Sequence, residues 1–319
     1  KLIMIDIIVI GGGAAGMTAA LYAKRSGKSV LIFEKESFGG QIANSPKVEN
    51  FPSIKEISGL ELSNNMFDQI MDLGVSFECE NVEHIEPKEN YFVVTTDYNT
   101  YECKSIVIAT GVKHRTIGVE REEELVGKGV SYCAVCDGAF YKGKDVAVIG
   151  DANTALQYTL MLADICKNVH LCMLFDKFFA DQTLVDRLST KENIHITKEI
   201  ALKEFVGNNE LTGLKFEHTK TKEIINIATD AVFIAIGQVP NNRMFSNILD
   251  IDEKGYIISS DTTTKTKGIY VAGDCRTKSV RQLTTAVGDG AICATKACKY
   301  LQTCFKVNSL FLYTKVFNA

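Results

Sequence analysis

Residues Gly11 to Gly16 constrain the fold most, because they read Gly-Gly-Gly-Ala-Ala-Gly between an apolar run and a helical pattern. The run Asp6–Ile10 is rich in β-branched residues and predicts a strand, and Ala14–Arg25 predicts a helix. Ser29–Glu34 predicts the next strand, so these segments form one strand–helix–strand unit. A chain that begins in this way is expected to build an open α/β sheet.

The glycine cluster matches the pattern G-x-G-x-x-G, which is typical of dinucleotide-binding turns. Gly11 allows the tight turn, Gly13 lets the backbone approach a pyrophosphate, and Gly16 allows close packing of helix on strand. Unpaired N–H groups at the start of the helix favour phosphate binding. Glu34 ends the second strand at the spacing expected for an acid that binds ribose hydroxyls. A purely structural turn is the alternative, but strand, helix and acid together favour a dinucleotide site.

A second strand–helix–strand unit follows more than a hundred residues later. Asp145–Ile149 predicts its first strand, Asn153–Ile165 its helix and Asn168–Leu174 its next strand. The separation of the two units is far too long for a solenoid repeat. The sequence therefore predicts two dinucleotide-type domains.

Three further apolar runs predict buried strands that each lead into glycine, as ligand-binding strand ends in α/β sheets do: Ser105–Ala109, Ala231–Ile236 and Gly268–Ala272. Gln282–Cys304 predicts a long closing helix. No low-complexity linker separates the parts, so we infer that the second domain is inserted into the first. The predicted fold is α/β, with two three-layer Rossmann-like domains. The domain limits are residues 1–114, the inserted residues 115–240, and residues 241–319.

Composition excludes several functional classes. The formal net charge of -4 gives no basic character that would suggest nucleic-acid binding. The apolar segment from Ile3 to Ala23 is interrupted by Asp6 and three glycines, so a buried strand and helix explain it better than a signal peptide or membrane span. The ten cysteines are scattered, which is typical of a protein in a reducing cytoplasm.

Cys133 and Cys136 are the one pair of cysteines at redox spacing. Such a pair can close a small disulfide, and a helix that starts there stabilises a thiolate, which is the attacking species. Asp137 follows directly and could donate or accept a proton. A zinc half-site or a chance pair is the alternative. Zinc would need a second pair of ligands, and neither C-x-x-C nor H-x-x-H recurs among the remaining residues, so no metal is expected.

Several motifs stand in one order along the chain: Gly11–Gly16, Gly39-Gly40-Gln41, Val48-Glu49-Asn50, Cys133-Ala134-Val135-Cys136-Asp137-Gly138, Gly268 to Asp274, and Arg281-Gln282. With them the chain resembles the low-molecular-weight thioredoxin reductases over roughly residues 5–305. The resemblance implies an FAD domain in two pieces, an inserted domain that carries the redox pair, and a homodimer. It also implies that the inserted domain rotates, so that the pair alternates between the flavin and a protein substrate, which would be thioredoxin.

The resemblance also implies a set of FAD-binding residues, carried over by position. Asp274 suits a ribityl hydroxyl, because a carboxylate accepts hydrogen bonds strongly, and Arg281 with Gln282 would lie near the flavin ring. The full set is Gly11, Gly13, Ala14, Ala15, Gly16, Glu34, Gly40, Gln41, Asn50, Val82, Thr110, Gly111, Gly273, Asp274, Arg281, Gln282 and Leu283. Cys133, Cys136 and Asp137 would be catalytic, with Cys136 facing the flavin.

The second glycine cluster departs from the family pattern. It reads Gly150 to Ala155, with Ala152 at the glycine position whose missing Cβ lets a pyrophosphate approach. Asp151 adds negative charge at a site meant for phosphates. Leu174, Phe175 and Phe179 occupy the region where NADPH-using members carry arginines that bind the 2′-phosphate. The sequence therefore predicts that the inserted domain has lost its nucleotide and that NADPH is not used.

Another donor must then reduce the flavin. The chain resembles the ferredoxin-dependent flavin thioredoxin reductases, which keep FAD and Cys-x-x-Cys but dispense with pyridine nucleotide. Three alternatives stay open: an NAD(P)H-dependent reductase, a flavin dithiol oxidase that passes electrons to oxygen, and a non-catalytic redox sensor. Beyond the closing helix, aromatic residues in 307–319 could cover the flavin ring, but dimer packing or a frayed end explains them better.

Overall fold

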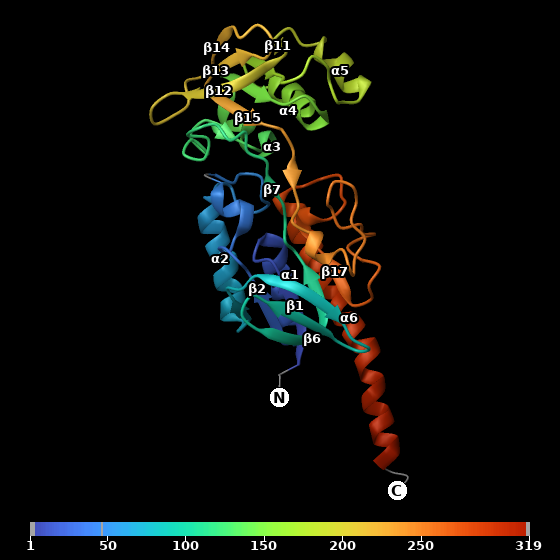
Figure 1. Ribbon diagram of the computed structural model, residues 1–319. Helices are drawn as coiled ribbons and strands as arrows, with labels where there is room; N and C mark the ends of the chain where they lie inside the picture. Colours follow the sequence, from blue (N-terminus) through green and yellow to red (C-terminus); the bar gives the residue numbers. More distant parts are fainter. Residues whose placement is uncertain (1–3, 46, 317–319) are drawn as a thin grey trace. The chain divides into compact units, whose positions relative to one another are not determined.

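The computed structural model describes residues 4–45 and 47–316, with side chains as far as residue 304. The chain divides into two compact units (Figure 1): unit 1 comprises Lys1–Lys113 with Val239–Ala319, and unit 2 comprises His114–Gln238. The two crossings are the short strands β7 (Lys113–His114) and β16 (Gln238–Val239), which pair with each other. The sequence had placed the boundaries one or two residues further along, after residues 114 and 240.

Unit 1 is built on a seven-stranded sheet. Its parallel strands are β1 (Ile5–Ile10), β2 (Val30–Phe33), β3 (Ser76–Glu78), β6 (Thr100–Ile108) and β17 (Ile269–Val271). The strand β5 (Phe92–Thr96) pairs antiparallel with β6, and β4 (Val82–Pro87) pairs antiparallel with β5. Residues 7–10 of β1 are fully or almost fully buried because both faces of the sheet are covered.

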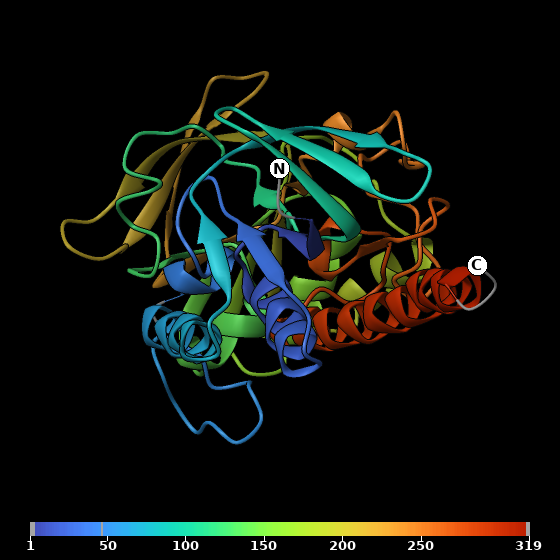
Figure 2. The same ribbon diagram turned by 90° about the horizontal axis from the view of Figure 1, so that it is seen from below.

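Helices α1 (Ala14–Arg25), α2 (Gly59–Asp72) and α6 (Leu283–Val316) contribute side chains to the apolar core on one face of this sheet. Figure 2 shows these helices side by side. A Cβ on Gly290 of α6 would lie 2.2 Å from the carbonyl oxygen of Ala15, so the two helix backbones are in direct contact. The hydroxyl of Ser58 caps α2 by accepting the N–H of Glu61 at 3.1 Å. A second apolar core contains the other side chains of the central strands together with side chains of β4, β5 and the short helix η3 (Arg243–Phe245).

Unit 2 has three layers. Its central sheet is parallel, in the order β11 (Ile194–Thr197), β10 (Asn168–Cys172), β9 (Asp145–Ile149), β15 (Ala231–Ile234) and β8 (Val130–Ser131). One face packs against α4 (Asn153–Ala163) and α5 (Gln182–Leu188). The other face packs against an antiparallel sheet of β12 (Ile200–Val206), β13 (Gly213–His218) and β14 (Ile224–Ala228). The predicted α/β fold class is confirmed.

The main differences from the predicted elements concern the residues at which strands and helices begin or end. β6 begins at Thr100 rather than Ser105, because its first residues pair with β5. α4 ends at Ala163, two residues early, and α6 continues to Val316. The tail aromatics Phe311, Tyr313 and Phe317 lie outside the residues whose side chains are described. None of the helices, as far as the described residues extend, is long and apolar enough to cross a membrane.

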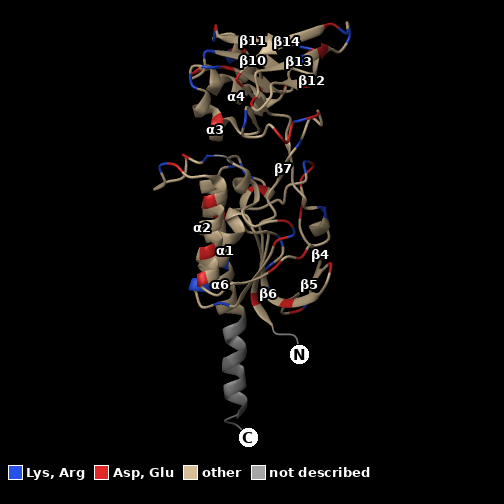
Figure 3. Cartoon of the chain, turned by 90° about the vertical axis from the view of Figure 1, so that its left-hand side faces the viewer, with Lys and Arg blue, Asp and Glu red and all other residues tan. Residues whose placement is uncertain are grey.

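Acidic and basic residues lie interspersed over each unit in the described part of the chain (Figure 3), in keeping with the small net charge.

Candidate functional site

The turn after β1 forms a cradle at the start of α1. Gly11 adopts φ +109°, and a Cβ there would lie 2.3 Å from the carbonyl oxygen of Ala109. A Cβ on Gly16 would lie 1.9 Å from the carbonyl oxygen of Gly11, so only glycine fits either position. A Cβ on Gly13 would instead meet no atom within 4 Å. The protein therefore leaves open space beside Gly13, at the N-terminus of a helix, where a phosphate group fits.

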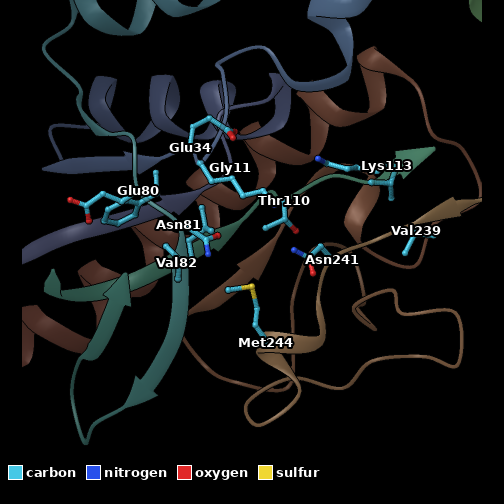
Figure 4. A pocket seen from close by; sticks show the side chains of 14 residues that line it. Gly11, Glu34, Glu80, Asn81, Val82, Thr110, Lys113, Val239, Asn241 and Met244 are labelled. Atoms are coloured by element: carbon cyan, nitrogen blue, oxygen red, sulfur yellow. The ribbon is translucent and has the colours of Figure 1, made fainter. Parts of the chain in front are cut away.

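Glu34 lies at the end of β2 next to this cradle. Its carboxylate accepts the N–H of Gly12 at 2.8 Å and the N–H of Glu36 at 2.9 Å. It lines a pocket at the carboxyl ends of β1, β2 and β6, where open α/β sheets bind ligands (Figure 4). The predicted residues Gly11, Val82 and Thr110 line the same pocket.

Sequence reasoning missed several residues of this pocket. The lining also includes the polar side chains of Glu80, Asn81, Lys113 and Asn241 and the thioether of Met244. The missed signal was Asn241-Asn242, two adjacent amides directly after the predicted return crossing. Asn242 is buried, accepts the hydroxyl of Thr110 at 3.1 Å and donates to the carbonyl oxygens of residues 255 and 275.

Asp274 lies in the short helix η4 (Gly273–Cys275) and has a buried oxygen, Oδ1, without a hydrogen-bond partner among the described residues. Burial raises the pKa of this carboxyl, although the positive charges of Lys278 and Arg281 oppose the shift. A buried carboxylate oxygen without a partner is costly, and a ligand hydroxyl would satisfy it. The guanidinium of Arg281 stabilises the loop of residues 274–281, because it donates to the carbonyl oxygens of Asp274, Arg276 and Lys278.

A buried ionic cluster fixes the same loop to α6. Asp289 accepts the N–H of Gly273 at 3.0 Å, two N–H groups of Arg276 at 3.0 and 3.1 Å, and the ammonium of Lys278 at 2.9 Å. Burial alone would raise the pKa of Asp289, but these hydrogen bonds hold it below its usual range. The cluster was not predicted, because the three residues only meet when the loop folds onto α6.

Some of the remaining predicted residues of unit 1 lie next to the cradle. The N–H of Gly39 donates to Gly12 at 2.9 Å, which brings Gly40 and Gln41 of η1 (Gly40–Asn44) to the turn. Ala14 and Ala15 begin α1, and a Cβ on Gly273 would lie 3.0 Å from the Cβ of Ala15. The side-chain amide of Asn50 donates to the side-chain oxygen of Gln282 at 3.4 Å, and Leu283 is the first residue of α6. Gly111 adopts φ +63°.

Unit 2 carries the cysteine pair at the carboxyl end of β8. Cys133 and Cys136 form a disulfide, with their Cα atoms 5.3 Å apart. Cys133 is the N-cap of the single-turn helix α3 (Ala134–Asp137), which continues into η2 (Gly138–Tyr141). Its Sγ accepts the backbone N–H of Cys136 at 3.2 Å. That hydrogen bond favours negative charge on Cys133 when the pair is reduced.

Asp137 is half-buried and directly follows the pair. Its Oδ2 accepts the hydroxyl of Ser131 at 2.6 Å, whereas its Oδ1 is buried with no hydrogen-bond partner in the described part of the chain. Burial raises the pKa of this carboxyl, and the Ser131 hydrogen bond opposes the shift. A carboxyl with a raised pKa next to a disulfide can exchange a proton with the sulfur atoms.

The second glycine turn, after β9, has the same backbone bridge as the first, but it carries side chains at Ala152 and Phe179 where the first has Gly13 and Gly39. The carbonyl of Asp151 accepts the N–H of Phe179 at 2.8 Å, and Ala152 pairs with Phe179 as an isolated bridge. Asn153, the first residue of α4, exchanges two hydrogen bonds with Asp181, at 2.8 and 2.9 Å. Two acidic residues, Asp151 and Asp181, therefore belong to the place where a nucleotide-binding turn would hold phosphate.

The loop after β10 presents apolar side chains. Leu174, Phe175 and Phe179 are each about half exposed, at 48%, 49% and 51%. The rings of Phe175 and Phe179 contact edge to face, with centroids 5.4 Å apart. The ammonium of Lys177 lies 5.1 Å from the Phe179 ring and is thus engaged with an aromatic face.

Three of the histidines lie against another ring. His170 and His195 face each other on β10 and β11, with ring centroids 5.1 Å apart, and His114 stacks on Tyr132 at 5.0 Å. No group of three His, Cys, Asp or Glu side chains that could hold a metal ion occurs among the described residues.

An open dinucleotide cradle in one Rossmann-like unit and a Cys-x-x-Cys disulfide in another define a two-domain disulfide oxidoreductase. The pyridine nucleotide-disulphide oxidoreductase family matches residues 5–290, and the chain belongs to that family.

Among its relatives, the thioredoxin reductase of Bacillus subtilis is 39% identical over 93% of this chain and 95% of that protein. The crystal structure of thioredoxin reductase from Streptococcus pyogenes is 38% identical, covers 95% of this chain and all of that chain, and superposes with a TM-score of 0.92. A more distant crystal structure, of a ferredoxin-flavin thioredoxin reductase from Clostridium acetobutylicum, is 28% identical over 95% of this chain and 99% of that chain, with a TM-score of 0.52.

Proposed function

We propose that this protein is a flavoprotein that reduces the disulfide of a thioredoxin through Cys133 and Cys136, with electrons from a reduced ferredoxin rather than from NADPH. The observation that carries the proposal is the contrast between the two nucleotide turns. The same kind of backbone bridge joins Gly13 to Gly39 and Ala152 to Phe179, but the first pair has no side chains, whereas the second brings a methyl group and an aromatic ring to the turn.

FAD is the cofactor that the residues of unit 1 fit. The space beside Gly13 suits the pyrophosphate, Glu34 and the pocket beside it suit the adenosine half, and the unpaired Oδ1 of Asp274 suits a ribityl hydroxyl. Bound FAD would supply the ability to accept electrons singly and to pass them on as a pair. The residues carried over by family resemblance, from Gly11 to Leu283, are proposed as its contacts.

The cysteine pair would carry out the exchange with the substrate. Two electrons and two protons open the Cys133–Cys136 disulfide to two thiols, and Cys133 then gives its proton to water to become a thiolate. The thiolate of Cys133, favoured by the N–H of Cys136, attacks the partner disulfide and forms a mixed disulfide, with one partner thiolate as leaving group. Cys136 then attacks the sulfur of Cys133, which releases the second partner thiol and restores the original disulfide. Asp137 is the proposed proton donor to the leaving thiolate.

Two features of unit 2 support a donor other than NADPH. The carboxylates of Asp151 and Asp181 would repel a pyrophosphate, since like charges at 4 Å cost about 1 kcal/mol in water and more in a drier site. Leu174, Phe175 and Phe179 offer no forked donor for a 2′-phosphate. The name of the Clostridium acetobutylicum relative also joins ferredoxin to this fold.

An NAD(P)H-dependent reductase is the second candidate, and the relatives favour it. The family takes its name from pyridine nucleotides, and the thioredoxin reductases of Bacillus subtilis and Streptococcus pyogenes are closer in sequence than the ferredoxin-flavin enzyme. This candidate requires that the turn at Ala152 admits a pyrophosphate although Asp151 and Asp181 lie beside it.

An anaerobic titration of the purified yellow protein separates the two candidates. Flavin absorbance is followed while NADPH, NADH or chemically reduced ferredoxin is added in separate cuvettes with thioredoxin present. We expect bleaching and thioredoxin thiols only with ferredoxin. Rapid bleaching by NADPH or NADH would establish the second candidate instead. A Cys133→Ser, Cys136→Ser variant is the control, since it should bleach without producing thioredoxin thiols.

We also propose, from the family resemblance, that the protein is a homodimer that works in the cytoplasm. Sedimentation velocity of the FAD-loaded protein should give a particle of twice the chain mass of 35.1 kDa, and a single species of one chain mass would refute the dimer.

A further inference from the structure

Ser131 occupies a position between the two groups that the exchange reaction needs. It is the last residue of β8 and is 5% exposed. Its hydroxyl donates to Oδ2 of Asp137 at 2.6 Å and accepts the backbone N–H of Cys133 at 3.0 Å. One oxygen atom thus connects the carboxyl group to the backbone of the first cysteine.

This arrangement leaves the two oxygens of Asp137 unequal. Oδ2 is engaged by Ser131, whereas Oδ1 is buried without a partner among the described residues. An ionised carboxylate with an unsolvated oxygen is unfavourable, so a proton is best placed on that oxygen. A proton on Oδ1 is available for transfer, because no acceptor among the described residues forms a hydrogen bond with it.

We propose that Ser131 is a positioning residue for the disulfide exchange: its hydroxyl fixes Asp137 through Oδ2, so that Oδ1 is the atom that carries the proton. The inference rests on the proposed role of Asp137 as proton donor. When the mixed disulfide forms, the leaving thiolate of the partner takes the proton from Oδ1. Asp137 then becomes a carboxylate, which the Ser131 hydroxyl stabilises. Water restores the proton afterwards.

The surroundings of Asp137 let its titration be followed without interference. Tyr141 of η2 and Tyr158 of α4 both respond to the charge of Asp137. Burial first and the Asp137 charge second raise the pKa of both phenols, so both stay neutral while the carboxyl titrates. The cysteines of α3 do not titrate while they are joined in the disulfide.

The test is the titration of Asp137 in the oxidised, FAD-loaded protein, followed by the infrared carbonyl band of its protonated carboxyl. The band is assigned by its loss in Asp137→Asn. Ser131→Ala removes a hydrogen bond to the charged form, so the apparent pKa of Asp137 should rise by about one unit, a tenfold change in proton affinity. Ser131→Thr keeps a hydroxyl and should titrate as the wild type does.

Ser105→Ala is the matched control, because it removes another buried serine hydroxyl, in unit 1, whose partner is the carbonyl of Gly268. It should leave the Asp137 band unchanged. The proposal is overturned if Ser131→Ala titrates like the wild type, or if Ser105→Ala produces the same shift. This readout needs neither thioredoxin nor an electron donor, so it stands apart from the outcome of the flavin titration. If the titration of Asp137 shifts in Ser131→Ala as expected but the flavin titration fails, the positioning stands and only the proposed substrate or donor is wrong.

Discussion

Replacing Gly13 by alanine separates the stability of the protein from its ability to hold a dinucleotide. Gly13 has φ -75° and ψ 179°, an extended conformation that alanine adopts freely. The added methyl group would meet no atom of the protein within 4 Å. It would point into the space beside the N-terminus of α1, which we assign to the pyrophosphate.

The expected magnitudes differ for the two properties. The stability of the FAD-free protein should change by less than about 1 kcal/mol, because a lower chain entropy in the unfolded state offsets the weaker N-cap. The methyl group should prevent one or two hydrogen bonds from backbone N–H groups to the phosphate. Hydrogen bonds to charged groups are worth about 1.5–3 kcal/mol each. FAD affinity should then fall by about 2–4 kcal/mol, which is about 30-fold to about 1000-fold.

The assay uses protein stripped of its flavin. The FAD dissociation constant is measured from the quenching of flavin fluorescence, and stability from urea unfolding without FAD. Gly288→Ala is the matched control, since its methyl group would also meet nothing within 4 Å but lies on α6 rather than in the turn. Unchanged FAD affinity in Gly13→Ala would refute the phosphate assignment. A large loss of stability without FAD would refute the claim that the space is empty of protein.

Three further predictions concern α6 and its loop. Gly290→Ala would place a Cβ 2.2 Å from the carbonyl oxygen of Ala15, so it should lower the midpoint of thermal unfolding strongly, by overpacking worth about 1–3 kcal/mol or more. Asp274→Ala should stabilise the FAD-free protein, because it removes a buried oxygen without a hydrogen-bond partner among the described residues, and this is measured by urea unfolding. The same variant should bind FAD more weakly, which is measured by flavin fluorescence. The folded-state pKa of Asp289 is lowered by Arg276, so its contribution to stability is present above the unfolded pKa of about 4 and is lost as pH falls through the folded pKa. Asp289→Asn should therefore show a smaller loss of stability between pH 6 and pH 3, and an unchanged acid profile would contradict the ionic cluster.

Local patterns were sufficient for the parts of the fold that depend on neighbours in sequence. The strand before Gly11 and the helix after it follow from β-branched and helical runs, and both occur within one residue of the predicted bounds. The second unit behaves in the same way, except that α4 ends at Ala163 and β10 at Cys172, each two residues before the predicted end. Strands such as β12 to β14 escaped prediction because they are held by pairing with each other rather than by a distinctive pattern of their own.

The residues of the candidate site also fall into those that local sequence patterns predict and those that they do not. Glu34 and the cysteine pair could be predicted because motif spacing fixes them relative to a strand or helix. Asn242 could not, because its partner Thr110 is 132 residues away in the sequence. The Asp289 cluster could not, because Arg276 and Lys278 lie in an irregular loop that meets α6 only in the folded chain. Ser131 stood inside a recognised motif, but its role depends on a hydrogen bond that spacing does not reveal.

The pairing of β7 with β16 has a consequence for protein engineering. Because the chain leaves unit 1 and returns to it on adjacent hydrogen-bonded strands, residues 114–238 form a cassette whose two ends lie together. Such a cassette can be excised and replaced by a short turn that joins residue 113 to residue 239, or exchanged for the corresponding segment of a relative. A flavin-binding module without its thiol pair, and a hybrid with the inserted segment of the Bacillus subtilis enzyme, are thus both accessible by a single segmental replacement.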